Sequence, residues 1–230
     1  MMEQANINTP SRIDVTNINE KVYNYIKENI INSNFPSGYK INFKQLIEDL
    51  GVSQTPIKDA LFRLAGEGLI DIQARTGTYV RSITETDIHE IIQARVFLET
   101  SAVGEIISII TDQDLQTLRE IYKKSVSLSL KPNDTESYKM FMEYDSQFHF
   151  CFFRILGNKN LFNMYRNLNA HMQIVRFRLI NHTQGILPRT NELHRAILDA
   201  LYERNAEKAK QAIIDHMVQL KQDVTSISQR

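Results

Sequence analysis

The chain has 230 residues, with 27 Lys or Arg against 27 Asp or Glu, so its formal net charge is zero. Hydrophobic residues make up 42% and charged residues 23% of the sequence, a balance typical of globular proteins that bury a core. No apolar run is long enough to predict a transmembrane helix, the first thirty residues lack a signal-peptide pattern, and the single cysteine, Cys151, excludes an intramolecular disulfide. We therefore expect a cytoplasmic protein without membrane contact, made of one large domain or two small ones.

The N-terminal part begins with a segment that has no periodicity. Residues 1–16 contain Asn, Thr, Pro and Ser, and we expect a flexible arm there. Apolar residues at helical spacing then predict a first helix from about Ile18 to Ser33 and a short second helix that ends before Gly51. Because glycine readily adopts a positive φ, Gly51 suits a sharp turn between two helices.

The third predicted helix has the form of a DNA recognition helix. Ser53 and Thr55 offer oxygens to the free N–H groups of its first turn, where the missing N–H of Pro56 costs nothing. The apolar positions share one face at i, i+3, i+4 and i+7 spacing: Ile57, Ala60, Leu61 and Leu64. The other side carries Gln54, Thr55, Lys58, Phe62 and Arg63. An ordinary surface helix would show the same pattern, so the elements after it decide between the two.

Two short β-rich runs follow, around Ile70 and Tyr79, and a Gly-containing loop joins them. Three helices and a hairpin form the plan of a winged helix-turn-helix, which we place at residues 17–82. This span has eight Lys or Arg against seven Asp or Glu, a net charge of +1, so overall charge does not indicate a nucleic-acid partner. Arg75, beside Gly77 at the hairpin tip, would reach a phosphate or the minor groove. The predicted DNA contacts are Lys44, Ser53, Gln54, Thr55, Lys58, Arg63, Arg75 and Gly77.

Only helical periodicity is present after the hairpin, which predicts an all-helical second domain over residues 83–230. Thr84, followed three residues later by Asp87, resembles a capping box at the start of this domain. The predicted helices cover about 84–110, 112–129, 135–157, 159–182, 187–203 and 205–228. The predicted fold is therefore mainly α, with a winged helix-turn-helix followed by a helical bundle.

Four residues of the second domain form a candidate metal site. Asp145 and His149 are four residues apart, so both project from one face of a helix. His194 and His216 lie on two successive helices, which a short loop near Asn205 makes antiparallel neighbours. Three imidazoles and one carboxylate suit Zn²⁺, Ni²⁺ or a similar divalent metal, and a metal removes the cost of burying an unpaired carboxylate.

Other polar residues of this domain allow two interpretations. Arg95 either pairs with Glu99 at i+4, which contributes about 0.3–0.5 kcal/mol on an exposed helix, or grips the carboxylate of a ligand. Asn169 and Arg176 could line a pocket, and Cys151 is expected to be a small buried apolar residue. The remaining histidines lack a partner at ligand spacing, and we interpret them as ordinary surface or pocket residues: His89, His171 and His182.

Taken in order, the N-terminal motifs resemble the GntR family of bacterial transcription regulators. The carrying residues are Pro36 and Gly38, Gly51 to Pro56, Ala60 with Leu61 and Leu64, Glu67 to Ile70, and Gly77 to Val80. The resemblance implies a winged helix-turn-helix that binds DNA. The family commonly has arginine where this chain has Gln54 and Lys58, and glutamine prefers adenine where arginine prefers guanine. The usual operator bases of the family are therefore not carried over.

The helical part resembles the FadR-like effector domain of the FCD type. The carrying features are Arg95-x-x-x-Glu99, Asp145-x-x-x-His149, His194 and His216. The resemblance implies that the aspartate and the three histidines hold a divalent metal inside the bundle. It also implies that a small carboxylate ligand, with Arg95 as a candidate contact, completes the coordination of that metal.

These observations together predict a ligand-responsive transcription regulator and not an enzyme. A homodimer would place two recognition helices in successive major grooves of a palindromic operator. An organic acid at the metal would shift the placement of the DNA-binding domains, and repression relieved by ligand is the expected direction. Two alternatives stay open: a metal-dependent, hydrolase-like enzyme, because such a site could activate water, and a regulator whose metal is purely structural.

Overall fold

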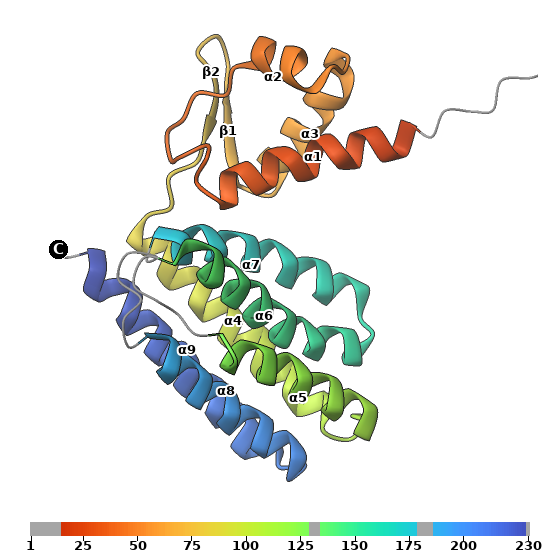
Figure 1. The fold of residues 1–230 in the computed structure, drawn as a ribbon, viewed down its shortest axis with the longest axis vertical. Helices are drawn as coiled ribbons and strands as arrows, with labels where there is room; N and C mark the ends of the chain where they lie inside the picture. The colour runs from red at the N-terminus through yellow and green to blue at the C-terminus, as the bar shows by residue number, and fades with distance from the viewer. Residues whose placement is uncertain (1–14, 129–133, 179–185, 229–230) are drawn as a thin grey trace, which may run out of the picture. The chain divides into compact units, whose positions relative to one another are not determined.

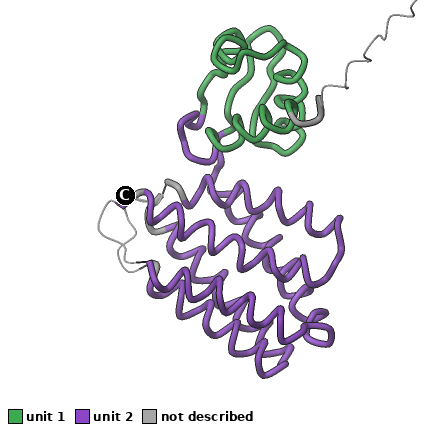
Figure 2. The backbone as a smooth tube through the Cα atoms, turned by 45° about the vertical axis from the view of Figure 1, so that its right-hand side comes forward, with its two compact units in different colours: residues 1–30, 38–81 green, residues 31–37, 82–230 purple. Residues whose placement is uncertain are grey.

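The computed structural model of the protein describes residues 15–128, 134–178 and 186–228 (Figure 1). The chain forms two compact units, one comprising Met1–Ile30 and Gly38–Arg81 and the other Ile31–Ser37 and Ser82–Arg230 (Figure 2). Most of the predicted arm, residues 1–16, lies outside the described part, and so does His182. The first helix, α1 (Val15–Ile31), begins at Val15, so the last two residues assigned to the arm belong to this helix.

The first unit consists of three helices and a β-hairpin, as predicted. After α1 come α2 (Phe43–Leu50), α3 (Gln54–Gly66), β1 (Ile70–Gln73) and β2 (Gly77–Val80). The two strands are antiparallel, with Ile70 opposite Val80, and Lys40 adds an isolated bridge to Tyr79 of β2. The predicted apolar face of α3 is buried, and its side chains Ile57 and Leu64 are fully enclosed in the core of the unit.

The turn between α2 and α3 follows the sequence closely, with one exception. Gly51 ends α2 with a left-handed conformation, φ 60°, and its N–H donates to the carbonyl of Ile47. Ser53 is the N-cap residue of α3, but its side chain makes no capping hydrogen bond. A cap oxygen accepts from the second or third N–H of the helix, and the third position is Pro56, which has no N–H. The predicted capping role of Ser53 is therefore wrong.

The second unit is a helical bundle. Its helices are α4 (Glu85–Ile106), α5 (Asp112–Val126), α6 (Thr135–Leu156), α7 (Lys159–Arg178), α8 (Ile186–Tyr202) and α9 (Ala206–Ser228). The predicted capping box starts α4: the Thr84 hydroxyl accepts from the Asp87 N–H at 3.1 Å, and the Asp87 carboxylate accepts from the Thr84 N–H at 2.8 Å. The end of α4 lies four residues before the predicted end at 110, in a turn where Ile110 donates to the carbonyl of Ile106.

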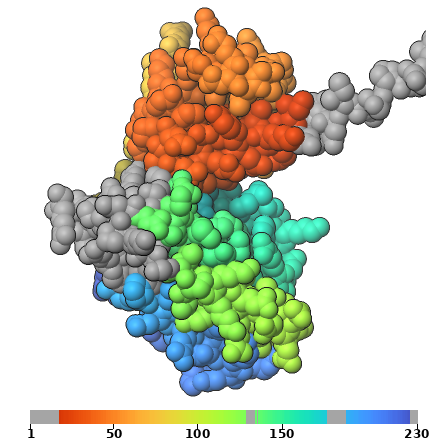
Figure 3. Space-filling view, in the orientation of Figure 1, coloured from red at the N-terminus to blue at the C-terminus, as the bar shows by residue number. Residues whose placement is uncertain are grey.

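The packing of these helices surrounds the interior of the bundle. α4 contacts α6, α7 and α9, while α8 packs on α9 and α5 packs on both α6 and α8. On the face of this unit seen in Figure 3, atoms of α5, α6 and α7 (yellow-green to cyan) cover much of the bundle. None of the described helices combines the length and the apolar character that crossing a membrane requires.

Candidate metal centre and recognition helix

The four predicted metal ligands converge inside the helical unit. Asp145, His149, His194 and His216 offer ligand atoms that all lie within 4.8 Å of one another, and none of the four residues is more than 2% exposed. One turn of α6 places Asp145 above His149, as the i, i+4 spacing requires. A short connection joins α8 to α9, and α9 starts where the Asn205 side chain accepts from the Lys208 N–H at 3.0 Å. Because α8 and α9 pack against each other, His194 and His216 reach the same cluster.

Several polar atoms of this cluster have no hydrogen-bond partner among the described residues. They are both ring nitrogens of His216 and Oδ1 of Asp145. His194 Nε2 lies 3.4 Å from that oxygen, which is within ion-pair distance but not in hydrogen-bond geometry. His149 Nε2 lies 3.2 Å from His194 Nε2. Buried polar atoms are nearly always paired, so a converging set of unpaired imidazole nitrogens and a carboxylate oxygen fits a metal ion.

The electrostatics of the cluster favour the protonation states that bind metals. Burial lowers the pKa of His194 to about 3, even though the Asp145 carboxylate acts in the opposite direction. Burial and the two other imidazoles lower the pKa of His216 well below its usual value. Burial alone would raise the pKa of Asp145, but the Arg176 guanidinium and the imidazoles hold it well below its usual range. A carboxylate and neutral imidazoles are the forms that coordinate a metal.

A second carboxylate, Glu99 on α4, contacts the cluster from behind His149. Its Oε2 lies 2.6 Å from His149 Nδ1, and its Oε1 accepts from Arg95 Nε at 2.8 Å. Arg95 Nη2 also donates to the Tyr165 hydroxyl at 3.0 Å. Burial alone would raise the pKa of Glu99, but the charge of Arg95 and the contact with His149 lower it to about 2. Glu99 is therefore a carboxylate that joins Arg95 to a predicted metal ligand.

The structure confirms the first interpretation of Arg95, its pair with Glu99, while the contact with a ligand stays a prediction. The pair with Glu99 exists, but both residues are 0% exposed, so the small contribution expected of an exposed pair does not apply. Arg95 Nη1 is buried without a hydrogen-bond partner among the described residues, so one donor faces the interior unused. The spacing in the sequence predicts Glu99 only as a partner of Arg95, and its contact with His149 was not predicted. The sequence does contain a signal that Glu99 is buried. Arg95 and Glu99 lie on the same face of α4 as the apolar residues Ile91, Ile92 and Ala102.

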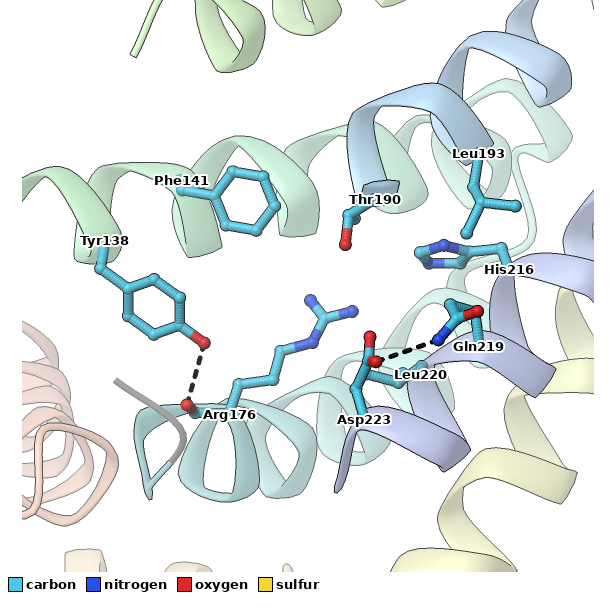
Figure 4. Close-up of a pocket in the computed structure, with 9 residues that line it drawn as sticks. All are labelled: Tyr138, Phe141, Arg176, Thr190, Leu193, His216, Gln219, Leu220 and Asp223. Atoms are coloured by element: carbon cyan, nitrogen blue, oxygen red, sulfur yellow. Dashed lines mark hydrogen bonds between the residues drawn. The ribbon is translucent and has the colours of Figure 1, made fainter. Parts of the chain in front are cut away.

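Arg176 of α7 balances the charge of Asp145. Its Nη1 donates to Asp145 Oδ2, and its backbone carbonyl accepts from the Tyr138 hydroxyl at 3.0 Å (Figure 4). A small cavity of about 20 Å³, roughly the room of one water, adjoins His216 and the Arg176 guanidinium. It is lined by Tyr138, Phe141, Arg176, Thr190, Leu193, His216, Gln219, Leu220 and Asp223. Arg176 therefore lines a cavity, as the sequence suggested, and it also pairs with a predicted metal ligand.

Two other predicted residues have mainly structural surroundings. Asn169 does not line this cavity, and its side-chain amide donates to Ser146 Oγ at 3.1 Å inside the bundle. Cys151 is buried, as expected, and burial raises the pKa of its thiol, which disfavours the reactive thiolate. His89 is exposed on α4.

The predicted DNA contacts of the first unit lie mostly on its surface. Side chains exposed to solvent are those of Lys44, Ser53, Gln54, Thr55, Lys58, Arg63 and Arg75. Arg75 forms the hairpin tip with a positive φ of 68°. At Gly77, φ is 136° and an added Cβ would lie 2.7 Å from Lys40 Cε, so this glycine has a structural role.

Arg63 differs from the other predicted DNA contacts, because its charge is used within the unit. Its Nη1 donates to Glu20 Oε1 at 2.5 Å, and its guanidinium lies 3.7 Å from the ring centre of Tyr23. Its role at DNA stays a prediction, in competition with this structural one.

Comparison with known proteins supports the assignment of both units. A model of the GntR family of bacterial regulatory proteins matches residues 18–80, and a model of the FCD domain matches residues 90–219. The chain belongs to the GntR family and carries an FCD domain. The predicted resemblance is thus confirmed over most of the sequence. The FCD match lies within the second compact unit, and the GntR match covers most of the first unit together with residues 31–37.

Relatives of this GntR-family chain are also described as regulators. It is 29% identical over 197 residues to the uncharacterized HTH-type transcriptional regulator YdhC of Bacillus subtilis (strain 168), covering 84% of this chain and 85% of the relative. It is 23% identical over 213 residues to the HTH-type transcriptional repressor RspR of Escherichia coli (strain K12), covering 92% and 91%. The solved structure of E. coli McbR/YncC has the same fold, with a TM-score of 0.77, 20% identity and coverage of 92% and 98%. The chain is therefore a transcription regulator and not an enzyme.

Proposed function

We propose that this regulator is a homodimeric repressor whose FCD domain holds a divalent metal and senses a small carboxylate. The observation that carries the proposal is the buried cluster of Asp145, His149, His194 and His216, whose ligand atoms all lie within 4.8 Å of one another. Asp145 and His216 have atoms without a hydrogen-bond partner among the described residues, and His216 also lines the cavity. A purely structural arrangement would pair those atoms within the chain. The name of the relative RspR supports repression as the direction of control.

The donor set selects the class of metal. One carboxylate and three imidazoles suit Zn²⁺ or Ni²⁺, whereas Mg²⁺ and Ca²⁺ prefer sites made of oxygen ligands. Asp145 would supply an oxygen, and His149, His194 and His216 would supply one nitrogen each. When bound, the metal acts as a Lewis acid that attracts the oxygens of an anion.

The charges around the cluster support an anionic effector. The carboxylates of Asp145 and Glu99 are balanced by the guanidinium groups of Arg176 and Arg95, so the buried set is neutral when the imidazoles are neutral. A divalent metal would add two positive charges in a place with little access to water. A carboxylate would offset that charge, and the unused Nη1 of Arg95 offers it a hydrogen-bond donor.

For DNA, we propose that α3 enters the major groove and that Arg75 of the hairpin contacts the backbone or the minor groove. Gln54, Thr55 and Lys58 are exposed in the first turns of α3, and Ser53 is not used as a cap. Polar side chains at the N-terminal end of a recognition helix are those that reach base edges. Two copies of the chain would read the two half-sites of a palindromic operator.

Fluorescence anisotropy tests the proposal on labelled DNA from upstream of the gene for this chain, with the full chain loaded with Zn²⁺. We expect specific binding that weakens with salt, and release when one of a panel of small carboxylates is added. Equal affinity for random DNA at the same salt concentration would refute the operator assignment. If chelation lowers the melting temperature but no carboxylate shifts it, the metal is structural and the effector assignment is wrong.

A further inference from the structure

Four buried side chains form a continuous chain of contacts behind the metal cluster. Tyr165 of α7 accepts from Arg95 of α4, Arg95 donates to Glu99 one turn later, and Glu99 contacts His149 Nδ1 of α6. All four residues are 0% exposed. This series of contacts ends at His149, a predicted metal ligand, while Glu99 itself is not one of the four predicted ligands.

The contact between Glu99 and His149 determines where the imidazole proton lies. A neutral imidazole carries one N–H, and a carboxylate can only accept a hydrogen bond. At 2.6 Å from Glu99 Oε2, the Nδ1 atom of His149 must therefore be the donor. The lone pair is then on Nε2, which is the nitrogen that lies 3.2 Å from His194 in the cluster.

We propose that Glu99 is a positioning residue of the metal centre, which fixes the tautomer and the ring orientation of His149 so that Nε2 faces the ion. The inference rests on the metal binding proposed above and adds a residue to it. Without Glu99, His149 could also adopt the tautomer with its proton on Nε2, and that proton would prevent Nε2 from binding the ion.

Arg95 and Tyr165 explain how Glu99 can serve this role at a buried position. A buried carboxylate is costly unless it is paired and hydrogen-bonded. Arg95 Nε supplies the paired charge at 2.8 Å, and the Tyr165 hydroxyl at 3.0 Å from Arg95 Nη2 fixes the guanidinium in turn. One carboxylate oxygen is thereby occupied by Arg95, and the other is directed at the imidazole.

The test is the Glu99→Gln variant of the full chain, studied with and without Zn²⁺. The side-chain amide keeps the size of the carboxylate but donates as well as accepts, so it no longer enforces one tautomer. We expect the affinity for Zn²⁺, measured by competition with a chelator, to fall about 10–100-fold. In the metal-free chain, NMR of isotope-labelled histidine should show His149 protonated on Nδ1 in the wild type and a mixture of tautomers in the variant.

Two further variants keep the result interpretable. Glu90→Gln makes the same substitution at an exposed position of α4 and should leave both the tautomer and the Zn²⁺ affinity unchanged. Arg95→Met combined with Glu99→Gln removes both buried charges and preserves packing if the single variant does not fold, and it should show the same loss of affinity. A wild-type chain that binds no Zn²⁺ refutes the proposed metal centre. A wild type and a Glu99→Gln variant with equal affinity and the same tautomer refute only the role of Glu99.

Discussion

Glu67 in the winged-helix unit and Asp145 in the helical unit are both carboxylates withdrawn from solvent, yet their surroundings differ. Both oxygens of Glu67 are used within the chain: Oε1 accepts from the Tyr23 hydroxyl at 2.7 Å, and Oε2 accepts from Lys27 Nζ at 2.7 Å. Asp145 has one oxygen paired with Arg176 and one with no hydrogen bond among the described residues. The first carboxylate completes a structural network, and the second leaves an atom available to a ligand.

This difference indicates that Glu67 stabilises the fold, whereas Asp145 is placed to bind a ligand. A buried acceptor that is fully paired contributes to folding, whereas leaving one unpaired costs about 1–3 kcal/mol. Glu67 ties α3 to Lys27 of α1, so its partners explain it completely. The unpaired Oδ1 of Asp145 carries this energetic cost next to three imidazoles, and binding of a metal ion would offset it. The number of unpaired atoms, more than burial itself, distinguishes the two sites.

The largest effect we expect is on metal-linked stability. At a free Zn²⁺ concentration about 1,000 times Kd, the metal should stabilise the wild-type chain by about 4 kcal/mol, measured by denaturant unfolding with and without Zn²⁺. Asp145→Asn should abolish most of this difference, because a neutral amide is a poor ligand for the ion. His149→Ala and His194→Ala should lose the metal in elemental analysis while the winged-helix unit still binds DNA. Unchanged stoichiometry in both histidine variants would show that the ligands are misassigned.

The matching change in the other unit should act on stability alone. Glu67→Gln replaces the same chemical group and should destabilise the winged-helix unit by about 1–3 kcal/mol, because Lys27 loses its charged partner. The Zn²⁺-induced gain in stability should equal that of the wild type. A smaller gain in Glu67→Gln would mean that the two carboxylates are not functionally separate.

Acid should weaken the two units of the metal-free chain at different pH values. The pKa values of His194 and His216 are lowered in the folded state. The stability of the folded chain therefore does not suffer from these histidines above about pH 6.5. Below that pH it falls, because the unfolded chain takes up protons that the folded chain does not. The slope is at most about 1.4 kcal/mol per pH unit for each histidine. The pKa of Glu67 is also lowered, but the stability it contributes is lost only below about pH 4.5.

Hydrogen exchange of the metal-free chain at pH 7 and at pH 5.5, corrected for intrinsic exchange rates, measures this contrast. Amides of α6, α8 and α9 should lose protection at the lower pH, while those of α1 and α3 should keep it. His194→Gln should reduce the pH dependence of the helical unit. Equal loss in both units would contradict the assignment to the buried histidines.

The smallest effect concerns two basic residues of α3. Lys58 is exposed and should contact a phosphate, so Lys58→Ala should weaken operator binding and reduce the slope of its salt dependence by about one. The guanidinium of Arg63 is held by Glu20 and Tyr23, so Arg63→Ala should cost up to about 1 kcal/mol of stability and leave the salt slope nearly unchanged. Anisotropy titrations at several salt concentrations compare the two, and equal slopes would place Arg63 at the DNA.

Features that depend on neighbours along the chain could be predicted from the amino-acid sequence alone. Helix spacing placed Asp145 and His149 on one face, the capping box predicted the start of α4, and Gly51 predicted the turn before α3. Family motifs added His194 and His216 to the set of predicted ligands. These signals are local, because they depend on residues within one turn or on short motifs with fixed spacing.

Contacts between side chains on different helices could not be predicted from the sequence. Glu99 meets His149 fifty positions away, and Arg176 meets Asp145 from a different helix. Arg63 has the sequence context of a DNA contact, yet it meets Glu20 of α1. Periodicity indicates the face on which a residue lies, but not the partner that the packing brings to that face. The residues that pair with the buried charges could therefore be identified only from the three-dimensional fold.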